Sequence, residues 1–461
     1  MDEAAAESRP AQARAGAGAS PAVDPVGLFS RFDLSGRRRV AVAVSGGGDS
    51  LALLILFRSF LTSAGSPVEP VAVTVDHRLR PESAGEARQV GEIAAGLGIA
   101  HRTLAWDGAK PASGLSAAAR EARHALLAQA AREAGTDIVL TGHTLDDRAE
   151  TLAMRRARGQ GRGEAGIAAA TLFDGRCWFV RPLLGVRRAA LRTFLAGLGQ
   201  AWIDDPGNTN MANERARTRA ALADAAIPRL AAEAEDAGRR RADLGRRAAA
   251  LIAAHARMPA PGLVRLDRRI GEGPDRAAAV YALRILLAAM GGRAHLPDEV
   301  RGAGLLDRMA GVNFRATLSR SVIDARRDGV FLLRERRGLP APAPAATGLW
   351  DGRYRIEGAS AGATVVAAGE AGAERAEAPA DVPRSLARAA AFARPAGRLD
   401  GGACVFLDAP TGFPVRARPV VAPWARYLPL FDVAPAAAAS ALLGAAPLPP
   451  APLAGHNDRR A

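Results

Sequence analysis

The sequence predicts an α/β protein whose N-terminal part is built on a parallel sheet, followed by a helical region and a small C-terminal domain with β character. Two observations lead to this prediction. Between Val40 and Ala226, short apolar stretches of strand length alternate with stretches of helix length, which is typical of βαβ units. From about Pro228 the pattern changes to a long helical stretch with arginine clusters, and strand-like segments follow it.

The expected elements of the N-terminal part follow from these patterns. Strands are predicted at residues 40–44, 71–76, 101–106 and 137–142, and helices near 50–61, 84–97 and 116–134. In a parallel sheet of this kind, ligands bind at the carboxyl ends of the strands, near a topological switch point. We therefore expect chemistry just after Val44, Val75 and Leu140.

Composition narrows the class of protein. The chain has 461 residues and a formal net charge of +15, which favours a polyanionic partner such as nucleic acid; a generically basic surface is the alternative. Cys177 and Cys404 form no C-x-x-C pair, which argues against a disulfide scaffold, a zinc ribbon or a redox centre and favours a reducing cytoplasm. No apolar run approaches about 18 residues without charges, so no membrane span is expected.

The segment SGGGDS, Ser45–Ser50, lies between a predicted strand and a predicted helix. Its three glycines allow close approach of the backbone, and N–H groups at a helix N-terminus bind anions. The segment lacks the lysine of a Walker motif and the spacing of a dinucleotide fingerprint. A phosphate-binding loop is the functional interpretation, and a flexible turn is the alternative.

Polar clusters follow the other predicted strands. They are VDHRLRPES (75–83), GLSAAAREARH (114–124) and TGHTLDDRAET (141–151). Each has a structural alternative: Asp76 and His77 could cap a strand end, and Asp146 and Asp147 could cap a helix, with Glu150 completing a capping box. Their common position at strand ends favours a shared site.

With these segments in place, the loop resembles the signature of the N-type ATP pyrophosphatases, the PP-loop superfamily. Five further segments, in the same order, resemble the tRNA(Ile)-lysidine synthetase family: VDHRLRPES, AREARH, GHTLDDRAET, RPLLGVRR and DDPGNTNMANERARTR. The similarity is dense from about residue 40 to 220. The fold that it implies for this part is a Rossmann-like PP-loop ATPase domain.

The sequence departs from the family at several positions. Arg78 stands where the family usually has glycine, and His124 where it has an aromatic residue. The loop after the acidic helix reads RGQGRGEAG, with Gln160 in place of a serine and two extra residues; Gly207 and Ala216 replace a serine and an asparagine. These departures bear on the conformation of the 156–166 loop more than on the chemistry.

The resemblance implies a reaction and a set of residues. ATP adenylates the C2 oxygen of the wobble cytidine in the isoleucine tRNA with a CAU anticodon, and L-lysine then displaces AMP. Catalysis is expected from Asp49, Arg120, Asp147 and Glu150, and nucleotide binding from Ser45, Gly46, Gly47, Gly48, Asp49, Ser50 and Asp76. Asp49 and Asp146 are the expected Mg²⁺ ligands, and Asp147, Glu150 and Arg215, the last paired with Arg219, are expected to bind lysine.

The expected domains are a disordered tail (1–25), the PP-loop catalytic domain (26–226), a helical linker and tRNA-binding domain (227–337), a Pro/Ala linker (338–348) and a C-terminal accessory domain with a low-complexity tail (349–461). Arginines 155, 156, 158 and 162 form a basic patch or a solvated helix end. The clusters Arg239–Arg241 and Arg246–Arg247, together with the segment beyond Pro340, are expected to bind the tRNA body. The expected location is cytoplasmic, and the oligomeric state, including a homodimer, stays open.

Three other interpretations fit parts of the sequence. Thiolation of tRNA by a PP-loop enzyme needs cysteines that carry sulfur or bind a cluster, and this chain has no suitable set. Glutamine-dependent relatives need an amidotransferase domain, for which the N-terminal segment is too short. A non-catalytic RNA-binding protein on the same fold would not need four acidic residues, Asp49, Asp146, Asp147 and Glu150, in a basic site.

Overall fold

The computed structural model describes residues 23–159, 162–204, 210–309, 311, 313–358, 360–399, 402–410 and 412–453. The chain divides into two compact units, Met1–Gly238 with Pro450–Ala461, and Arg239–Pro449. The second unit begins at Arg239, not at the predicted boundary of 227, and has no division at the predicted linker 338–348. Among the described residues, none of the helices combines the length and the apolar character that a membrane crossing requires.

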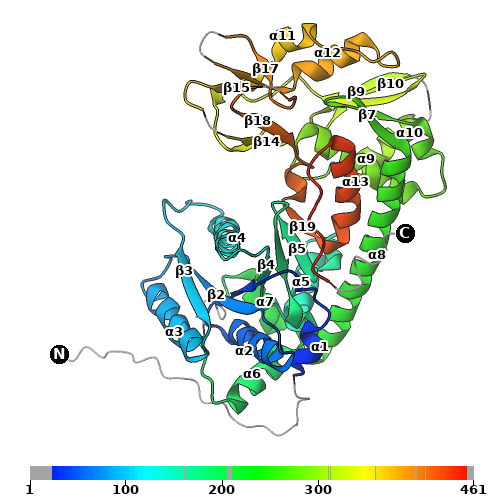
Figure 1. The fold of residues 1–461 in the computed structure, drawn as a ribbon. Helices are drawn as coiled ribbons and strands as arrows, with labels where there is room; N and C mark the ends of the chain where they lie inside the picture. Colours follow the sequence, from blue (N-terminus) through cyan, green and yellow to red (C-terminus); the bar gives the residue numbers. More distant parts are fainter. Residues whose placement is uncertain are drawn as a thin grey trace. The chain divides into compact units, whose positions relative to one another are not determined.

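The first unit contains the predicted parallel sheet (Figure 1). Within this unit the strand order is β5-β6-β4-β1-β2-β3. Neighbouring strands pair in parallel, except that β5 is antiparallel to β6. The strands are β1 (Arg39–Ala43), β2 (Glu69–Asp76), β3 (Ala100–Ala105), β4 (Ile138–Leu140), β5 (Ala170–Phe173) and β6 (Cys177–Val180). The predicted α/β class and the first four strands are confirmed, whereas the β5–β6 hairpin was not predicted.

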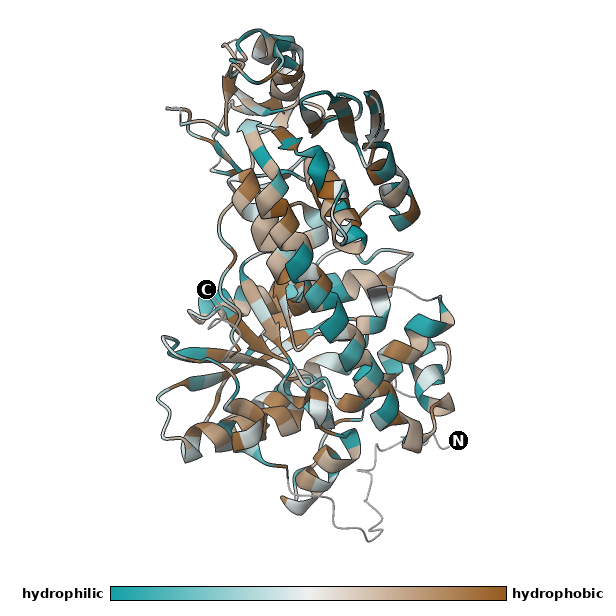
Figure 2. Ribbon diagram, turned by 90° about the vertical axis from the view of Figure 1, so that its right-hand side faces the viewer, coloured by the Kyte–Doolittle hydropathy of each residue, from teal (hydrophilic) through white to brown (hydrophobic). Residues whose placement is uncertain are grey.

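Helices cover both faces of this sheet. α2 (Gly48–Ser63) and α3 (Ser83–Gly96) follow β1 and β2, whereas α4 (Leu115–Glu133) connects β3 back across the sheet to β4. Because βαβ crossovers are right-handed, this reversal places α4 on the opposite face, as Figure 1 shows. The remaining helical segments are α5 (Leu145–Ala157), η1 (Arg162–Ala165), η2 (Pro182–Gly185), α6 (Arg188–Gly197), α7 (Glu214–Ala221) and η4 (Asp224–Ala226). Apolar residues concentrate on the strands (Figure 2), where Val40, Val42, Ile138 and Val139 are fully buried.

The chain before β1 contains a short helix, α1 (Pro25–Phe29). The Asp24 side chain accepts hydrogen bonds from the backbone of Val26 and Gly27, and Phe29 is buried with its ring 5.1 Å from that of Phe57. The predicted boundary of the disordered tail at residue 25 is therefore wrong, because Asp24 caps this helix and Pro25 begins it. Residues 1–22 lie outside the described residues.

His124 occupies the position at which the related family has an aromatic residue. Its ring is buried on α4, with its centroid 4.7 Å from the ring of Phe179 and 5.9 Å from that of Phe173. Its Nδ1 donates to the carbonyl oxygen of Arg120 at 2.8 Å. Burial lowers the pKa of His124 to about 4, so the imidazole remains neutral in the folded protein.

We predict that His124 makes the protein sensitive to acid. Because the pKa lies below the unfolded value of 6.5, the unfolded chain binds more protons between these values, and stability falls as the pH drops through this window. The loss of unfolding free energy between about pH 7 and pH 4.5 should be about 2 kcal/mol larger in the wild type than in His124→Phe. Urea unfolding at both pH values measures this difference, and equal losses would contradict the prediction.

The second unit is organised around an antiparallel sheet and a buried helix. α8 (Ile227–His255) begins in the first unit and leads into the sheet, whose order is β7-β8-β11-β10-β9. α9 (Arg276–Gly291) is apolar on nearly every side and packs on β10 and β11. The strands are β7 (Ala256–Ala260), β8 (Leu263–Leu266), β9 (Phe314–Leu318), β10 (Ser321–Arg326) and β11 (Gly329–Arg334), with η5 (Arg268–Gly271) and α10 (Glu299–Met309) between them.

Two smaller sheets complete this unit, with orders β12-β15-β16-β17 and β13-β14-β18. Their elements are β12 (Ala343–Pro344), β13 (Gly348–Trp350), β14 (Tyr354–Glu357), β15 (Thr364–Ala367), α11 (Gly369–Glu374), α12 (Arg384–Phe392), β16 (Pro395–Arg398), β17 (Val405–Phe406) and β18 (Arg416–Pro419). They are followed by η6 (Pro423–Ala425), β19 (Tyr427–Pro429), η7 (Leu430–Asp432) and α13 (Val433–Leu443). The Ala/Pro-rich stretches thus contain more regular structure than predicted, since β12 lies in the predicted linker and α13 in the predicted low-complexity tail. The helix α13 forms there because alanine is a strong helix former.

Candidate active site

The phosphate-loop candidate, Ser45–Ser50, connects β1 to α2. Ser50 ties the loop together, since its hydroxyl donates to the Gly47 carbonyl at 2.9 Å and accepts from the Ser45 backbone N–H at 3.1 Å. Gly47 is the N-cap of α2 and makes no side-chain cap hydrogen bond, so the loop leads directly into the N-terminus of this helix. A helix N-terminus at this place fits the anion-binding role that the sequence predicts, and that role stays a prediction.

Glycine is required at the second position of the Ser45–Ser50 loop. Gly46 has a φ of +87°, and a Cβ atom there would lie 2.6 Å from the Cδ1 atom of Ile203. The backbone N–H of Ile203 donates to the Gly46 carbonyl at 3.0 Å, and the Trp202 ring lies 3.5 Å from the position of a Cβ on Gly48. The segment after α6 therefore packs directly against the loop.

The loop lies at the topological switch point of the sheet. β1 has β2 on one side and β4 on the other, with Val42 opposite Leu140, so the segments that follow β1 and β4 leave the same edge. Gly142 brings them into contact, because a Cβ there would lie 2.9 Å from the Asp49 carbonyl oxygen and 3.0 Å from the Ser50 Cα. The absence of a side chain at Gly142 therefore sets the distance between the phosphate loop and α5.

We predict that Gly142→Ala separates these two segments. The added methyl group meets backbone atoms that cannot rotate away, so the variant should lose about 1–3 kcal/mol of stability and most of its activity. Gly96→Ala is a matched control at the end of α3, where nothing lies within 4 Å of the new Cβ. The unfolding temperature and the rate of AMP release should fall in Gly142→Ala and stay at the wild-type values in Gly96→Ala. Equal behaviour of the two variants would show that the close approach is unimportant.

The acidic residues of the site lie at the start of α5. Thr144 and Asp147 form a capping box: the Asp147 carboxylate accepts from the Thr144 backbone N–H at 2.7 Å, and the Thr144 hydroxyl accepts from the Asp147 N–H at 3.3 Å. The alternative in which Glu150 completes the capping box is therefore wrong, because Asp147 occupies that role. Only one Asp147 oxygen is used in this way, and the other faces a cluster of arginines.

Glu150 is almost completely buried, with 2% of its side chain exposed, and contacts three arginines. Arg219 Nε lies 2.7 Å from its Oε1 atom, and Arg215 Nε lies 3.1 Å from its Oε2 atom. Both arginines belong to α7, four residues apart on one face. The structure thus brings together Asp147, Glu150 and Arg215, which the sequence predicts at the lysine site, and adds Arg219, the predicted neighbour of Arg215.

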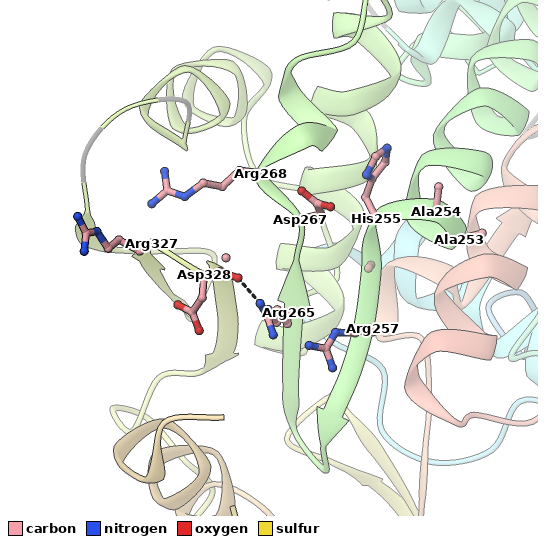
Figure 3. Close-up of a pocket in the computed structure, with 11 residues that line it drawn as sticks. Ala253, Ala254, His255, Arg257, Arg265, Asp267, Arg268, Arg327 and Asp328 are labelled. Atoms are coloured by element: carbon pink, nitrogen blue, oxygen red, sulfur yellow. Dashed lines mark hydrogen bonds between the residues drawn. The ribbon is translucent and has the colours of Figure 1, made fainter. Parts of the chain in front are cut away.

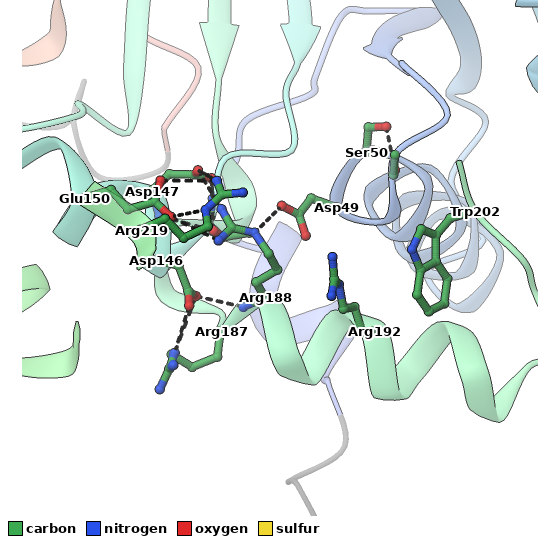
Figure 4. Close-up of polar contacts among 12 residues, drawn as sticks. Asp49, Ser50, Asp146, Asp147, Glu150, Arg187, Arg188, Arg192, Trp202 and Arg219 are labelled. Carbon is green, nitrogen blue, oxygen red and sulfur yellow. Dashed lines mark hydrogen bonds and ion pairs between the residues drawn. The ribbon is translucent and has the colours of Figure 1, made fainter. Parts of the chain in front are cut away.

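Arg188, the first residue of α6, joins this cluster to the phosphate loop (Figure 4). Its Nε donates to Asp49 Oδ2 at 2.9 Å, its Nη2 to Asp147 Oδ1 at 2.7 Å, and its Nη1 to Glu150 Oε1 at 3.1 Å. One guanidinium therefore contacts three carboxylates from two different segments.

Asp146 points toward the N-terminus of α6 instead. Its Oδ2 atom accepts from the Arg188 backbone N–H at 2.8 Å, and Arg187 Nε lies 3.4 Å away. Capping of α6 accounts for its position. Among the described residues, no three His, Cys, Asp or Glu side chains are grouped in a way that could hold a metal ion by themselves.

The electrostatics of Asp49 and Asp147 differ although they share Arg188. Burial raises the pKa of Asp49, and the Arg188 charge offsets only part of this effect. Burial also acts on Asp147, but Arg188 and Arg215 outweigh it and hold the pKa of Asp147 below its usual value. The three carboxylates raise the pKa of Arg188 despite its burial. Of these two carboxylates, Asp49 is thus the one whose charge is less compensated.

Asp76 ends β2, at the same edge of the sheet. Its carboxylate accepts from the Arg78 backbone N–H at 2.8 Å, which closes a tight turn. Arg78 has a φ of +51°, the left-handed conformation that favours glycine, which explains why the related family has glycine there. Burial opposes ionisation of Asp76, but hydrogen bonds from Ser83 and Arg78 outweigh it and lower the pKa.

Other predicted residues lie outside this cluster. Arg120 lies on α4 with an exposed side chain and is not one of the arginines described above. In the expected basic patch, Arg156 pairs with Glu233 at 2.6 Å and Arg158 pairs with Glu214, so both are partly neutralised. Gln160 and Gly207 lie outside the described residues.

Sequence reasoning missed Arg187, Arg188 and Trp202 as parts of the site. The two arginines could have been found in the segment RPLLGVRR, because this segment is one of those that resemble the family and lies outside the predicted helices. No pattern in the sequence marks Trp202, because only the folded chain places its ring against Gly48.

The second unit contains an arginine-rich hollow of about 460 Å³ between β7, β8 and the β10–β11 turn (Figure 3). Its polar lining is His255, Arg257, Arg265, Asp267, Arg268, Arg327 and Asp328. Arg257 and Arg265 pair with Asp381, and Arg268 donates to the carbonyl oxygens of Met309, Gly311 and Arg326. Because these partners account for three of its arginines, the hollow is not the catalytic candidate.

Comparison with known proteins agrees with the geometry. The PP-loop domain family matches residues 26–226. The tRNA(Ile)-lysidine synthase of Mesorhizobium japonicum is 48% identical over 447 residues, which cover 93% of this chain and 97% of that protein. That of Rhizobium meliloti is 41% identical, covering 72% and 75%. Among solved structures, a U34-tRNA thiolase from Methanococcus maripaludis matches with a TM-score of 0.40 and 16% identity, covering 47% of this chain and 76% of that one. The chain belongs to the tRNA(Ile)-lysidine synthase family.

Proposed function

We propose that the protein joins L-lysine to C2 of the wobble cytidine in the isoleucine tRNA with a CAU anticodon, at the expense of ATP. In the first step the C2 oxygen attacks the α-phosphorus of ATP, and pyrophosphate leaves. In the second step a lysine amine attacks C2, and AMP leaves with the C2 oxygen. The observation that carries this proposal is that Arg188 donates hydrogen bonds both to Asp49 in the phosphate loop and to Asp147 and Glu150 on α5.

The phosphate loop supplies the groups for the first step. The N–H groups at the start of α2 and the Ser45 and Ser50 hydroxyls would bind the pyrophosphate part of ATP. Asp76, at the end of β2, would face the nucleoside. Arg120, on the exposed face of α4, is proposed to reach the reacting phosphates once ATP is bound.

Mg²⁺ is the metal that fits the donors of this site. It prefers oxygen ligands and is commonly bound by one or two carboxylates together with substrate phosphates, so it does not require a preformed protein cage. Asp49 fits this role, because its carboxylate is half-buried beside the loop and its charge is only partly compensated. Asp146 would be a second ligand through lone pairs that α6 does not use. The ion would neutralise charge on the departing pyrophosphate.

Asp147 and Glu150 are proposed to bind the lysine substrate. Glu150 is almost fully buried and takes no part in the helix cap. Its charge is therefore available to pair with the surrounding arginines or with a cationic ligand. Arg215 is proposed to contact the lysine carboxylate. In this assignment the two acidic residues bind a positive charge of lysine and Arg215 binds its negative charge.

The cysteines do not support tRNA thiolation as the alternative. Cys177 is buried on β6, and burial raises its pKa to about 12, so it does not form the thiolate that sulfur transfer needs. Cys404 is also buried and lies in the second unit.

Binding of the tRNA body is proposed for the part of the chain after residue 227, within a cytoplasmic protein. Not every arginine of the expected clusters is available for this role. Arg241 pairs with the buried Asp432, which also accepts from Tyr281 at 3.0 Å, and Arg247 pairs with Asp275 at 2.6 Å. A homodimer remains a proposal that sedimentation would test.

The direct test is mass spectrometry of the isoleucine tRNA after incubation with the protein, ATP, Mg²⁺ and isotope-labelled lysine. We expect the label at the wobble cytidine, with one AMP and one pyrophosphate released for each lysine. A tRNA that gains sulfur, or that remains unmodified, would show that the proposal is wrong.

We predict that Glu150→Gln separates the two steps. Adenylation should persist, but the lysine concentration needed for half-maximal AMP release should rise about 10- to 150-fold, since a hydrogen bond to a charged group contributes about 1.5–3 kcal/mol. Glu133→Gln, at the exposed end of α4, is the control. If the lysine requirement of Glu150→Gln is unchanged, Glu150 serves the arginines only.

A further inference from the structure

Arg188 connects the residues that we assign to the two substrates. Its three donor nitrogens are distributed one to each carboxylate: Nε to Asp49 beside the phosphate loop, and the two Nη atoms to Asp147 and Glu150. Arg215 and Arg219 reach Asp147 and Glu150 from the other helix, α7. Arg188 therefore contacts residues of both the proposed ATP site and the proposed lysine site.

The charges of this cluster are balanced without substrates. Asp49, Asp147 and Glu150 face Arg188, Arg215 and Arg219, three charges of each sign. A lysine ammonium needs the oxygen atoms of Asp147 and Glu150 that the Arg188 guanidinium already holds. It can bind there only if a positive charge leaves.

ATP provides the reason for Arg188 to move. Its phosphates would bring several negative charges to the Ser45–Ser50 loop, beside Asp49 and the Nε atom of Arg188. A guanidinium binds phosphate oxygens through paired hydrogen bonds, so it would exchange carboxylates for phosphate.

The backbone of Arg188 is fixed, so that the motion would be confined to its side chain. Its N–H donates to Asp146 at 2.8 Å, and the Leu145 N–H donates to the Val186 carbonyl at 2.9 Å, which holds the starts of α5 and α6 together. The guanidinium lies at the end of a flexible chain, beyond this anchored point.

We propose that Arg188 is a positioning residue that makes lysine binding depend on ATP. Without nucleotide its guanidinium occupies the place of the lysine ammonium between Asp147 and Glu150. With ATP bound, it turns to the phosphates and leaves both carboxylates to lysine. This inference rests on the proposed function, because it takes lysine as the second substrate.

The test is calorimetric binding of lysine to the full-length protein, with and without Mg²⁺ and a non-hydrolysable ATP analogue. In the wild type, the nucleotide should tighten lysine binding about tenfold or more, within the usual range of coupling between sites. In Arg188→Gln, lysine binding without nucleotide should itself tighten about tenfold, and the nucleotide should then add little. Arg192→Gln, one turn further along α6 and paired with Asp204, should retain the wild-type coupling.

The outcomes separate the inference from the function. If the wild type binds lysine with nucleotide but Arg188→Gln shows unchanged coupling, the inference is wrong and the function stands. If the wild type binds no lysine with nucleotide present, the proposed function fails. Should Arg188→Gln not fold, Arg188→Lys is the second variant: its single ammonium cannot hold three carboxylates, so weakened coupling supports the inference and full coupling overturns it.

Discussion

Replacing Asp49 by asparagine should reduce adenylation of the tRNA by about 100- to 1,000-fold, the usual cost of removing one electrostatic group from a reacting centre. The side chain keeps its shape but loses the charge that we propose to hold Mg²⁺ at the phosphates. The fold should be unaffected, because burial raises the pKa of Asp49 and the charged carboxylate is therefore not a stabilising group there. Pyrophosphate release in the presence of tRNA measures the effect.

Asp137→Asn is the matched control for this variant. Asp137 precedes β4, at the opposite end of the strands, and pairs with Arg37 at 2.6 Å. Its replacement should cost about 1 kcal/mol of stability or less and leave adenylation unchanged. If Asp49→Asn releases pyrophosphate at the wild-type rate, Asp49 has no part in the chemistry.

The parts of the site that sequence reasoning could find are those fixed by the sheet. Strand-length apolar runs and the Ser45–Ser50 segment predicted a parallel sheet, and the carboxyl ends of neighbouring parallel strands necessarily meet. Asp49 and the acids of α5 therefore could be assigned to one site before their contacts were known. Glu150 could be separated from the helix cap only by the structure, because Asp147 and Glu150 both satisfy the spacing of a capping residue.

Arg188 could not be assigned in this way. It follows a hairpin, β5–β6, whose antiparallel pairing carries no helix between its strands, so the alternation that revealed the other strands stops there. Its role depends on the direction of one long side chain, which no spacing in the sequence encodes. The second unit was equally difficult, since strands of two to six residues in an Ala- and Pro-rich context have little periodicity.

A buried ion cluster in the second unit carries the other large expected effect. The Asp351 carboxylate is fully buried and accepts from Arg320 at 2.7 Å, Arg334 at 3.0 Å and Arg353 at 2.7 Å. The side chain of Arg334 is also fully buried, and burial lowers its pKa below the usual value even with Asp351 beside it. One carboxylate thus compensates several buried or half-buried guanidinium groups.

Replacing Asp351 by asparagine should lower the free energy of unfolding by about 3–5 kcal/mol, because it leaves Arg334 and Arg353 buried without a counter-charge. The amide also turns one acceptor into a donor that faces guanidinium N–H groups. The backbone is not the cause, since Asp351 has a φ of +50°, a conformation that asparagine adopts readily. Asp307→Asn, in the exposed pair with Arg276, should leave the midpoint of unfolding nearly unchanged. Urea unfolding of both variants measures the difference, and similar midpoints would mean that the cluster is solvated or dispensable.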